Sequence, residues 1–319
     1  MITVLTGGTG GAKFVDGLRH VVRQDELTII VNTGDDMTWW GLYVSPDIDS
    51  IVYMLAGKLS PERGWGVRRD TFFCLDAMRE LGQAAWFQAG DRDLAMHIFR
   101  TQRLTEGKTL SEVTAEIATC FGIGARIRPM SDSRIETRVR TPHGELSFQE
   151  YFVQRRYRDP VDSIRFAGAS EAAPAPGVIE AIRSAELILV APSNPITSIG
   201  PILAVPGIRA ALRESHACVA AVSPIVGGAA VSGPAGALLR AQGFTASIAG
   251  VAECYRDFLD LLVVDSQDAV AAEQLQKTGV RVHSTSTIMR KNEDRVALAK
   301  SVLSVCQQSP AAYAVREPA

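Results

Sequence analysis

The first residues of the chain, Ile2-Thr-Val-Leu-Thr-Gly-Gly-Thr-Gly-Gly-Ala-Lys13, decide the fold. A short β-branched run ends in four glycines and is followed by an apolar-periodic segment at residues 14–22. This order predicts a strand over residues 2–5, a glycine turn and then a helix. A helix N-terminus presents free N–H groups and a partial positive charge, and glycine lets the backbone approach a phosphate closely. The stretch therefore predicts a phosphate-bearing ligand beside the first strand.

The glycine stretch does not match the two common nucleotide-binding patterns. It fits neither G-x-G-x-x-G nor the Walker pattern, because Lys13 follows Ala12 and no Ser or Thr comes next. The residues alone leave the ligand open, and a plain strand–helix turn is the other explanation. A second apolar strand over residues 27–31 completes a β-α-β unit. We therefore expect a parallel sheet with helices on both faces.

Composition narrows the class of protein. A length of 319 residues fits one large α/β domain or two domains, and 46% hydrophobic residues is ordinary for a full core. A net charge of −2 argues against nucleic acid as a partner. The five scattered cysteines, without C-x-x-C, favour reduced thiols over a disulfide framework or zinc site. With a strand at the N-terminus and no long apolar run, we expect a cytoplasmic protein without a membrane span.

In the middle of the chain, the alternation of strands and helices is replaced by several helical patterns and a hairpin. Helical patterns over residues 69–81, 91–102 and 110–121 precede a β-hairpin around Thr141-Pro-His-Gly144. We interpret residues 58–159 as a mostly helical inserted subdomain that covers the active site. Residues 1–57 and 160–319 are then a Rossmann-like core of α/β class. In its second part we expect strands at 187–191, 218–222 and 261–264, and helices at 178–184, 207–213 and 293–305.

Four predicted strands end in unusual polar or glycine-rich loops. These loops follow Leu5, Val31, Ala191 and Val222. Ligands of open α/β sheets bind outside the carboxyl ends of the strands. We therefore expect the four loops to meet around one site.

Two pairs of carboxylates follow the second strand. They are Asp35 with Asp36, and Asp47 with Asp49. In one interpretation, Asp49 or Ser50 caps a helix over residues 51–56. In the other, the pairs hold Mg²⁺, which binds through one or two carboxylates together with substrate phosphates. The neighbouring phosphate loop favours the metal.

Two further polar stretches each allow a structural and a functional explanation. In Gly90-Asp-Arg-Asp93, either Asp91 caps the following helix or Arg92 binds a phosphate through its guanidinium fork. The rigid loop Pro192-Ser-Asn-Pro-Ile-Thr-Ser198 is either a wide turn or a contact for a nucleobase or ribose.

Histidine and tryptophan positions add little by themselves. The five histidines are dispersed, with His97 on a predicted helix, and their spacing predicts neither a catalytic triad nor zinc. The tryptophans cluster in the first third of the chain, where core packing is the default explanation. Trp39-Trp40 follows the acidic pair after two residues, however, and could offer a face to a planar heterocycle.

These stretches together resemble the 2-phospho-L-lactate transferase family of coenzyme F-420 biosynthesis (the CofD/FbiA family). Each segment is weak alone, but they run in order over nearly the whole chain. The matching segments are residues 7–14, 31–36, 45–49, 64–66, 90–95, 129–132, 191–201 and 222–227.

The resemblance implies a reaction and its ligands. It implies a three-layer Rossmann-like core that binds a guanosine diphosphate moiety with Mg²⁺, and a deazaflavin acceptor, 7,8-didemethyl-8-hydroxy-5-deazariboflavin. The ribityl hydroxyl of the acceptor attacks the phosphate that carries a carboxylic acid, and GMP leaves. The acid is lactate in archaeal members and enolpyruvate in many bacterial ones, with glycerate as a third type.

The resemblance also assigns roles by position. It places the deazaflavin at Asp49 and Gln88, although Gln88 replaces the basic residue expected in some members. Transfer from a diphosphate also needs its charge neutralised, for which we expect Mg²⁺ on Asp49 with Asp35, and positive charge from Arg92. Either Asp36 or Asp49 accepts the hydroxyl proton, and the sequence leaves that choice open. The residues implied for the guanosine diphosphate are Gly8, Thr9, Gly10, Gly11, Lys13, Asn32, Ser193 and Asn194.

Three further expectations accompany this interpretation. A homodimer is expected from the resemblance and from base rates. Asp49→Asn is expected to abolish transfer and leave the fold intact. Two other functions stay open: a metal-dependent nucleotide-sugar-type transferase, and a nucleotide-binding regulator without turnover. The Asp47–Asp49 pair and the Gly90–Asp93 stretch weigh against the regulator, because a protein that only senses a nucleotide would not need both.

Overall fold

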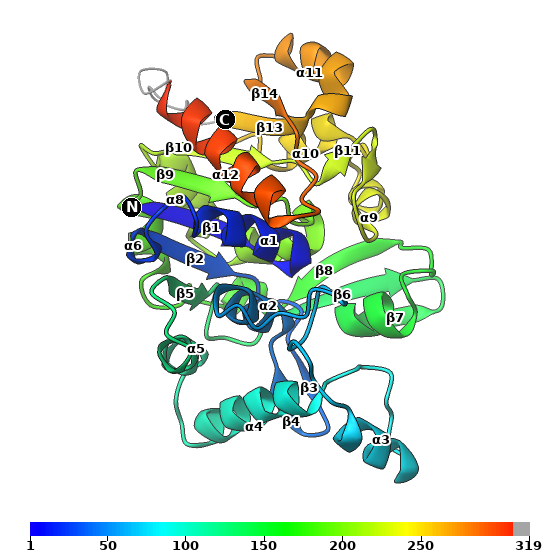
Figure 1. Cartoon of the computed structure of the whole chain (residues 1–319). Helices are drawn as coiled ribbons and strands as arrows, with labels where there is room; N and C mark the ends of the chain where they lie inside the picture. Colours follow the sequence, from blue (N-terminus) through cyan, green and yellow to red (C-terminus); the bar gives the residue numbers. More distant parts are fainter. Residues whose placement is uncertain (309–319) are drawn as a thin grey trace.

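A parallel sheet of seven strands forms the centre of the computed structural model, which describes residues 1–308 (Figure 1). The strand order is β14-β13-β10-β9-β1-β2-β5, and all neighbours are parallel. The strands are β1 (Ile2–Thr6), β2 (Leu27–Val31), β5 (Arg126–Pro129), β9 (Leu187–Val190), β10 (Cys218–Val222), β13 (Leu261–Asp265) and β14 (Val282–Thr285).

Helices surround this sheet, and three small antiparallel sheets accompany it. The helices are α1 (Gly8–Leu18), α2 (Pro46–Leu55), α3 (Phe73–Glu80), α4 (Asp91–Thr105), α5 (Leu110–Cys120), α6 (Val178–Arg183), α7 (Gly200–Ala204), α8 (Ile208–Glu214), α9 (Ala235–Ala241), α10 (Ile248–Cys254), α11 (Ala269–Gln276) and α12 (Asn292–Gln307). The short helical turns are η1 (Gln24–Glu26), η2 (Glu150–Gln154), η3 (Ala169–Glu171), η4 (Pro195–Ile199) and η5 (Ser266–Asp268). The small sheets pair β3 (Met37–Trp39) with β4 (Leu42–Val44), β6 (Glu136–Thr141) with β7 (Gly144–Ser147) and β8 (Ser163–Ala167), and β11 (Ile225–Val226) with β12 (Ala229–Ala230).

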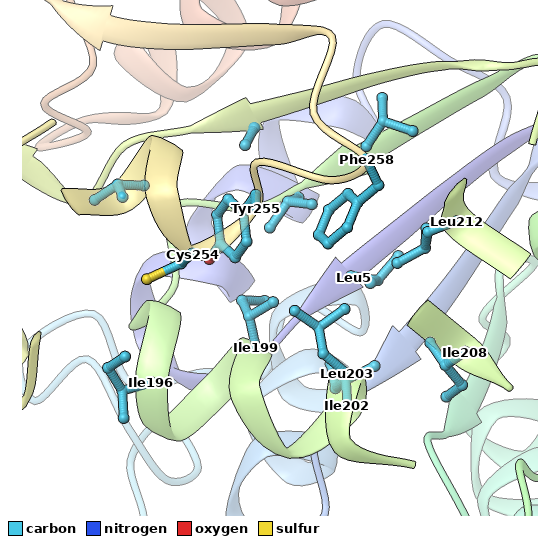
Figure 2. Packing of buried hydrophobic residues seen from close by; sticks show 14 of the residues in the cluster. Leu5, Ile196, Ile199, Ile202, Leu203, Ile208, Leu212, Cys254, Tyr255 and Phe258 are labelled. Atoms are coloured by element: carbon cyan, nitrogen blue, oxygen red, sulfur yellow. The ribbon is translucent and has the colours of Figure 1, made fainter. Parts of the chain in front are cut away.

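Alternation along the strands builds two apolar layers. Successive strand residues point to opposite faces, so a strand that is apolar throughout is covered on both sides. Val4 of β1 packs with α1, α2, α5 and α12 on one face. Leu5 packs on the other, among side chains from η4, α7, α8 and α10 (Figure 2). The predicted three-layer Rossmann-like fold is thus confirmed.

Two strands cross the borders expected for the inserted subdomain. β5 lies within residues 58–159 but is the edge strand of the central sheet, and β8 lies beyond residue 159 but pairs with β6. β5 carries Arg126 and Arg128, which suit an exposed edge and hide the strand from a search for apolar runs. The expected hairpin is present as β6–β7. The division into core and insertion stays a prediction.

The helices of residues 69–105 lie away from the sheet. In Figure 1, α3 and α4 extend with the β3–β4 hairpin beyond the edge formed by β5. Within residues 1–308, no single helix is long and apolar enough to cross a membrane. Two consecutive helical segments, Pro195–Ala204 and Ile208–Glu214, reach that length and composition when taken together, but the chain bends by 89° between them.

Helix α1 packs closely on α12, and Gly17 makes this possible. A Cβ built on Gly17 would overlap the backbone carbonyl of Arg295. We expect Gly17→Ala to lower the free energy of unfolding by about 1–3 kcal/mol, because the helices must separate. Gly236→Ala in α9 is the matched control, since its Cβ would meet Ala246 at an ordinary 3.4 Å. Equal urea-unfolding midpoints for the two variants would contradict this packing.

Candidate active site

A cavity of 570 Å³ lies at the carboxyl ends of the central strands. Its wall includes residues from the loops after β1, β2, β9 and β10, so the prediction that these loops meet is confirmed. β1 has β2 on one side and β9 on the other, which makes this the point where the strand order reverses. The predicted site residues that line the cavity are Gly8, Thr9, Gly10, Lys13, Asp35, Asp49, Gln88, Ser193 and Asn194.

The glycine loop is fixed by two side chains from other segments. Gly8 donates its N–H to Asp47 Oδ1 at 2.8 Å, and Ser193 Oγ donates to the Gly7 carbonyl at 2.7 Å. A Cβ on Gly7 would lie 2.6 Å from Asp47 Oδ2, so a side chain there would displace the carboxylate. The loop after β1 therefore needs glycine for close packing against α2 and the loop after β9.

Several residues predicted to bind the donor also hold the loops together. Gly11 does not line the cavity; a Cβ there would overlap Thr6 Oγ1, so the helix can pass the strand only without a side chain. Asn194 Oδ1 accepts the N–H groups of Ile196 and Thr197 and caps η4. The loop after β9 is thus a capped turn as well as a wall of the cavity.

Asn32 joins two carboxylates behind the cavity wall. Its Nδ2 lies 3.1 Å from Asp35 Oδ2 and 2.9 Å from Asp47 Oδ2, and it is fully buried. Burial raises the pKa of Asp47 to about 6. Burial, and then repulsion from Asp47, raise the pKa of Asp35 well above its usual value. The nearby Thr137 hydroxyl offsets part of this rise in the Asp35 pKa, but Asp35 Oδ1 has no partner within hydrogen-bond geometry in the part that the structure describes. Among the residues that the structure describes, no Lys, Arg or His forms an ion pair with Asp35 or Asp47.

Asp36 is placed differently from Asp35. It accepts hydrogen bonds from Ser45 Oγ at 2.8 Å and Tyr43 Oη at 3.0 Å, and it does not line the cavity. Burial raises its pKa well above the usual value. Its contacts join β4 to the start of α2.

The expected helix cap at Asp49 is wrong. Helix α2 begins at Pro46 rather than residue 51, with Ser45 as its N-cap residue. Proline suits the first helical position because its missing N–H has no partner there. Asp47 and Asp49 therefore lie in the first turn of α2, where negative charge is favourable.

Asp49 belongs to a buried polar cluster on the inner face of α4. Arg100 is fully buried and contacts both oxygens of Asp49, with Nη1 3.3 Å from Oδ2. His97 Nδ1 lies 3.6 Å from Asp49 Oδ2, and its Nε2 lies 3.6 Å from Asp93 Oδ1. Tyr53 Oη donates to the same Asp93 oxygen at 2.7 Å.

The sequence contained a signal for this cluster that histidine spacing alone did not show. Asp93, His97 and Arg100 are spaced by four and three residues, which places them on one face of a helix. Ligand atoms of Asp49, Asp93 and His97 all lie within 4.8 Å of one another. Asp49 brings the partner from α2, and only the fold reveals that contact.

In the Gly90–Asp93 stretch, the predicted helix cap at Asp91 is wrong, and Arg92 lies outside the first cavity. The Asp91 carboxylate accepts N–H groups of Phe73 and Cys74 at the start of α3, so it does not cap the helix that follows it. Asp70 instead accepts the N–H groups of Arg92 and Asp93 at the start of α4. The Arg92 side chain lines a second cavity and is not brought together with the glycine loop.

Aromatic side chains form another part of the wall. Trp65, Trp86, Phe87, Phe148 and Phe152 line the cavity. Trp86 rests edge-on against buried Trp39, with ring centroids 4.8 Å apart. The expected planar face at Trp39-Trp40 is therefore beneath the wall, and neither ring lines the cavity.

Comparison with known proteins gives the family. A sequence model described as 2-phospho-L-lactate transferase CofD matches residues 2–303. The chain belongs to the CofD family. It is 45% identical over 302 residues to a 2-phospho-L-lactate transferase of Methanococcoides burtonii, covering 95% of this chain and 98% of that protein. It is 42% identical over 313 residues to a phosphoenolpyruvate transferase of Streptomyces griseus, covering 96% and 98%.

A solved structure shares the fold of this CofD-family chain at low identity. A UPF0052 family protein of Bacillus halodurans, determined at 2.60 Å resolution, superposes with a TM-score of 0.63 at 16% identity. The match covers 95% of this chain and 98% of that one. It supports the architecture alone, because the identity is too low to carry the chemistry.

Asp47 makes stability depend on pH in a defined direction. The pKa of Asp47 is about 6 in the folded protein and 3.8 ordinarily, so the protonated carboxyl is favoured by folding. The stability that protonated Asp47 contributes is fully present below about pH 4 and is lost as pH rises through 6. Asp47→Asn cannot ionise. We expect its unfolding free energy, relative to wild type, to increase by roughly 3 kcal/mol between about pH 4 and pH 7. A difference that stays constant in urea unfolding across this range would contradict the buried-carboxylate assignment.

The Asp49–Arg100 pair should be essential for folding stability. We expect Arg100→Met to cost about 3–5 kcal/mol, because it leaves Asp49 buried without its cation. Arg103→Met on the same helix is the control; its partly exposed contacts with Glu106 and Glu116 should be worth less than about 1 kcal/mol. If thermal unfolding showed the same loss of stability for Arg100→Met and Arg103→Met, the buried pair would not be worth more than the exposed one, and the prediction would be refuted. Asp49→Asn likewise removes the partner of Arg100, so lost activity in that variant would not separate catalysis from folding.

Proposed function

We propose that this protein is a transferase of coenzyme F-420 biosynthesis. It moves a 2-phospholactate, phosphoenolpyruvate or 3-phosphoglycerate-type group from a guanosine diphosphate-linked donor to the ribityl hydroxyl of 7,8-didemethyl-8-hydroxy-5-deazariboflavin, and GMP leaves. The observation that carries the proposal is one cavity that joins a glycine-loop helix N-terminus to buried carboxylates and an aromatic wall. The names of the relatives support the transfer of a phospho-acid.

The donor occupies the side of the cavity formed by the loops after β1 and β9. Phosphate oxygens lie near the first turn of α1, whose N–H groups have no acceptor within the helix. Lys13 follows on the same helix and lines the cavity, and burial lowers its pKa. The Ser193–Asn194 turn provides the contact for the nucleoside.

Mg²⁺ fits the chemistry of the carboxylates at this edge. Asp35 has a buried oxygen without a partner, and Asp47 shares the Asn32 amide with it. Hard carboxylate oxygens are the protein ligands that Mg²⁺ prefers. Asp35 would hold the ion, with Asp47 or the predicted Asp49; both Asp49 oxygens already accept from Arg100. When bound, Mg²⁺ neutralises charge on the diphosphate.

The acceptor lies against the aromatic wall, with its hydroxyl toward Asp49. Gln88 is exposed at the cavity and contacts the ring system as the resemblance implies. The hydroxyl oxygen forms a bond to the acid-bearing phosphorus, and the bond from that phosphorus to the GMP oxygen breaks. Asp49 accepts the hydroxyl proton in preference to Asp36, which does not line the cavity. Positioning of the two substrates provides most of the acceleration.

Other parts of the prediction belong to this proposal. A homodimer and a cytoplasmic location are expected for it, and neither nucleic acid nor membrane takes part. A nucleotide-sugar-type transferase would release GDP instead of GMP, and a regulator would release neither. The aromatic wall beside the carboxylates favours the deazaflavin acceptor over a sugar, because planar rings gain most from such contacts.

Product analysis tests the function directly. Purified protein is incubated with the deazaflavin, Mg²⁺ and lactyl, enolpyruvyl and glyceryl donors together, and the products are analysed by mass spectrometry. We expect GMP and one phospho-acid adduct of the deazaflavin, and no adduct when EDTA replaces Mg²⁺. Lys13→Gln should lower kcat/KM about tenfold or more, whereas Lys300→Gln on the exposed side of α12 should not. Absence of GMP with all three donors would refute the proposal.

A further inference from the structure

A second cavity, of 480 Å³, lies between the loop after α2, the first half of α4 and the end of α5. Within the described residues, its lining shares only Tyr53 with the first cavity. It is within the size range of sites for small organic ligands.

Four cations border this second cavity. They are Lys58, Arg68, Arg69 and Arg92, and no Asp or Glu of residues 1–308 lines it. The side chains of all four are exposed, and none forms an ion pair or hydrogen bond within that part of the chain. Arg68 helps to lower the pKa of Glu62, but that carboxylate is bonded to Ser60 and lies outside the lining. Four cations around one cavity without a carboxylate in its lining create a local positive potential, although the chain carries a net charge of −2, and this potential attracts an anion.

Backbone contacts gather these cations from separate segments. The Arg68 N–H donates to the Lys58 carbonyl at 2.7 Å, next to an antiparallel bridge between Leu59 and Val67. Asp70 then accepts the Arg92 N–H at 2.8 Å, which brings the start of α4 beside Arg69. The arrangement is therefore built by the fold and does not depend on long side chains meeting by chance.

The floor of the second cavity is apolar and partly aromatic. Val67, Met96 and Ile117 are buried there, and the half-buried rings of Phe99 and Phe121 complete it. The Lys58 ammonium lies 5.5 Å from the Phe121 ring centroid. A ligand that satisfies both parts needs negative charge at one end and a flat apolar body at the other.

We propose that the second cavity binds a phosphate-bearing organic anion of the nucleotide class. Its phosphate is held by the Arg68, Arg69 and Arg92 guanidinium groups, which match phosphate geometry bidentately. Its ring system rests on the apolar floor. This site is separate from the donor site of the proposed transfer reaction and does not depend on that reaction.

Calorimetric titration with GMP tests the second cavity. Three full-length proteins are titrated: the wild type, a double variant of the second cavity and a double variant that serves as the control. We expect wild type to bind two GMP per chain, and Arg68→Gln/Arg69→Gln to lose the second or bind it about tenfold more weakly for each lost contact. The control Arg140→Gln/Arg158→Gln removes the same charge from exposed arginines outside both cavities and should keep two. Unchanged thermal unfolding shows that the exposed substitutions leave the fold intact.

The outcomes separate this site from the proposed function. The second site is overturned if wild type binds one GMP per chain and Arg68→Gln/Arg69→Gln binds it equally well. It is also overturned if wild type binds no GMP at all. One GMP per chain in wild type that is lost in that variant supports the site and contradicts GMP binding in the first cavity. Inorganic phosphate and guanosine should each bind the second cavity more weakly than GMP. Phosphate binding as tightly as GMP would refute the role of the apolar floor.

Discussion

The structure depends on keeping negative charge buried at the carboxyl edge of the sheet. Asp35, Asp47 and Asp49 are all at most 7% exposed, and isolated carboxylates are costly in such surroundings. Asp49 is neutralised by Arg100, whereas Asp47 relies on the neutral N–H groups of Gly8 and Asn32. The glycine loop is thus part of the charge compensation, because its backbone must come close enough to donate.

This requirement ties the helical segment to the sheet. Asp49 stands on α2 in the core, but its cation is on α4, in the range expected to be an insertion. The polar face of α4 is turned inward because Asp93 and His97 accompany Arg100 on it. Separating residues 58–159 from the rest would leave a carboxylate and a guanidinium unpaired. The segment is therefore part of the folding unit in energetic terms, even though its helices lie away from the sheet.

The sequence predicted well whatever depends on local patterns. β2 and β10 are continuous apolar runs and begin and end where expected, and the four polar loops meet because parallel strands share one edge. Predictions failed where the deciding partner is distant in sequence. Asp91 serves the start of α3 rather than its own helix, and Asp47, in the first turn of α2, accepts the N–H of Gly8 from the distant glycine loop. Neighbouring Asp35 and Asp36 differ in their hydrogen-bond partners, and the sequence alone does not reveal that difference.

The two cavities illustrate opposite ways of receiving an anion. The first is lined by Asp35, Asp47, Asp49 and Asp93 against the cations Lys13 and Arg156, so charge alone would repel a diphosphate. In the proposed reaction, a diphosphate would be held there by directed N–H groups and a divalent cation, which would also fix the orientation that in-line transfer needs. The second is lined by four cations without a carboxylate among residues 1–308, so it can hold an anion through guanidinium groups but offers no carboxylate to accept a proton or bind a divalent cation. Since the proposed transfer needs a proton acceptor and a carboxylate that can bind a metal ion, the acidic cavity is the one to expect catalysis from.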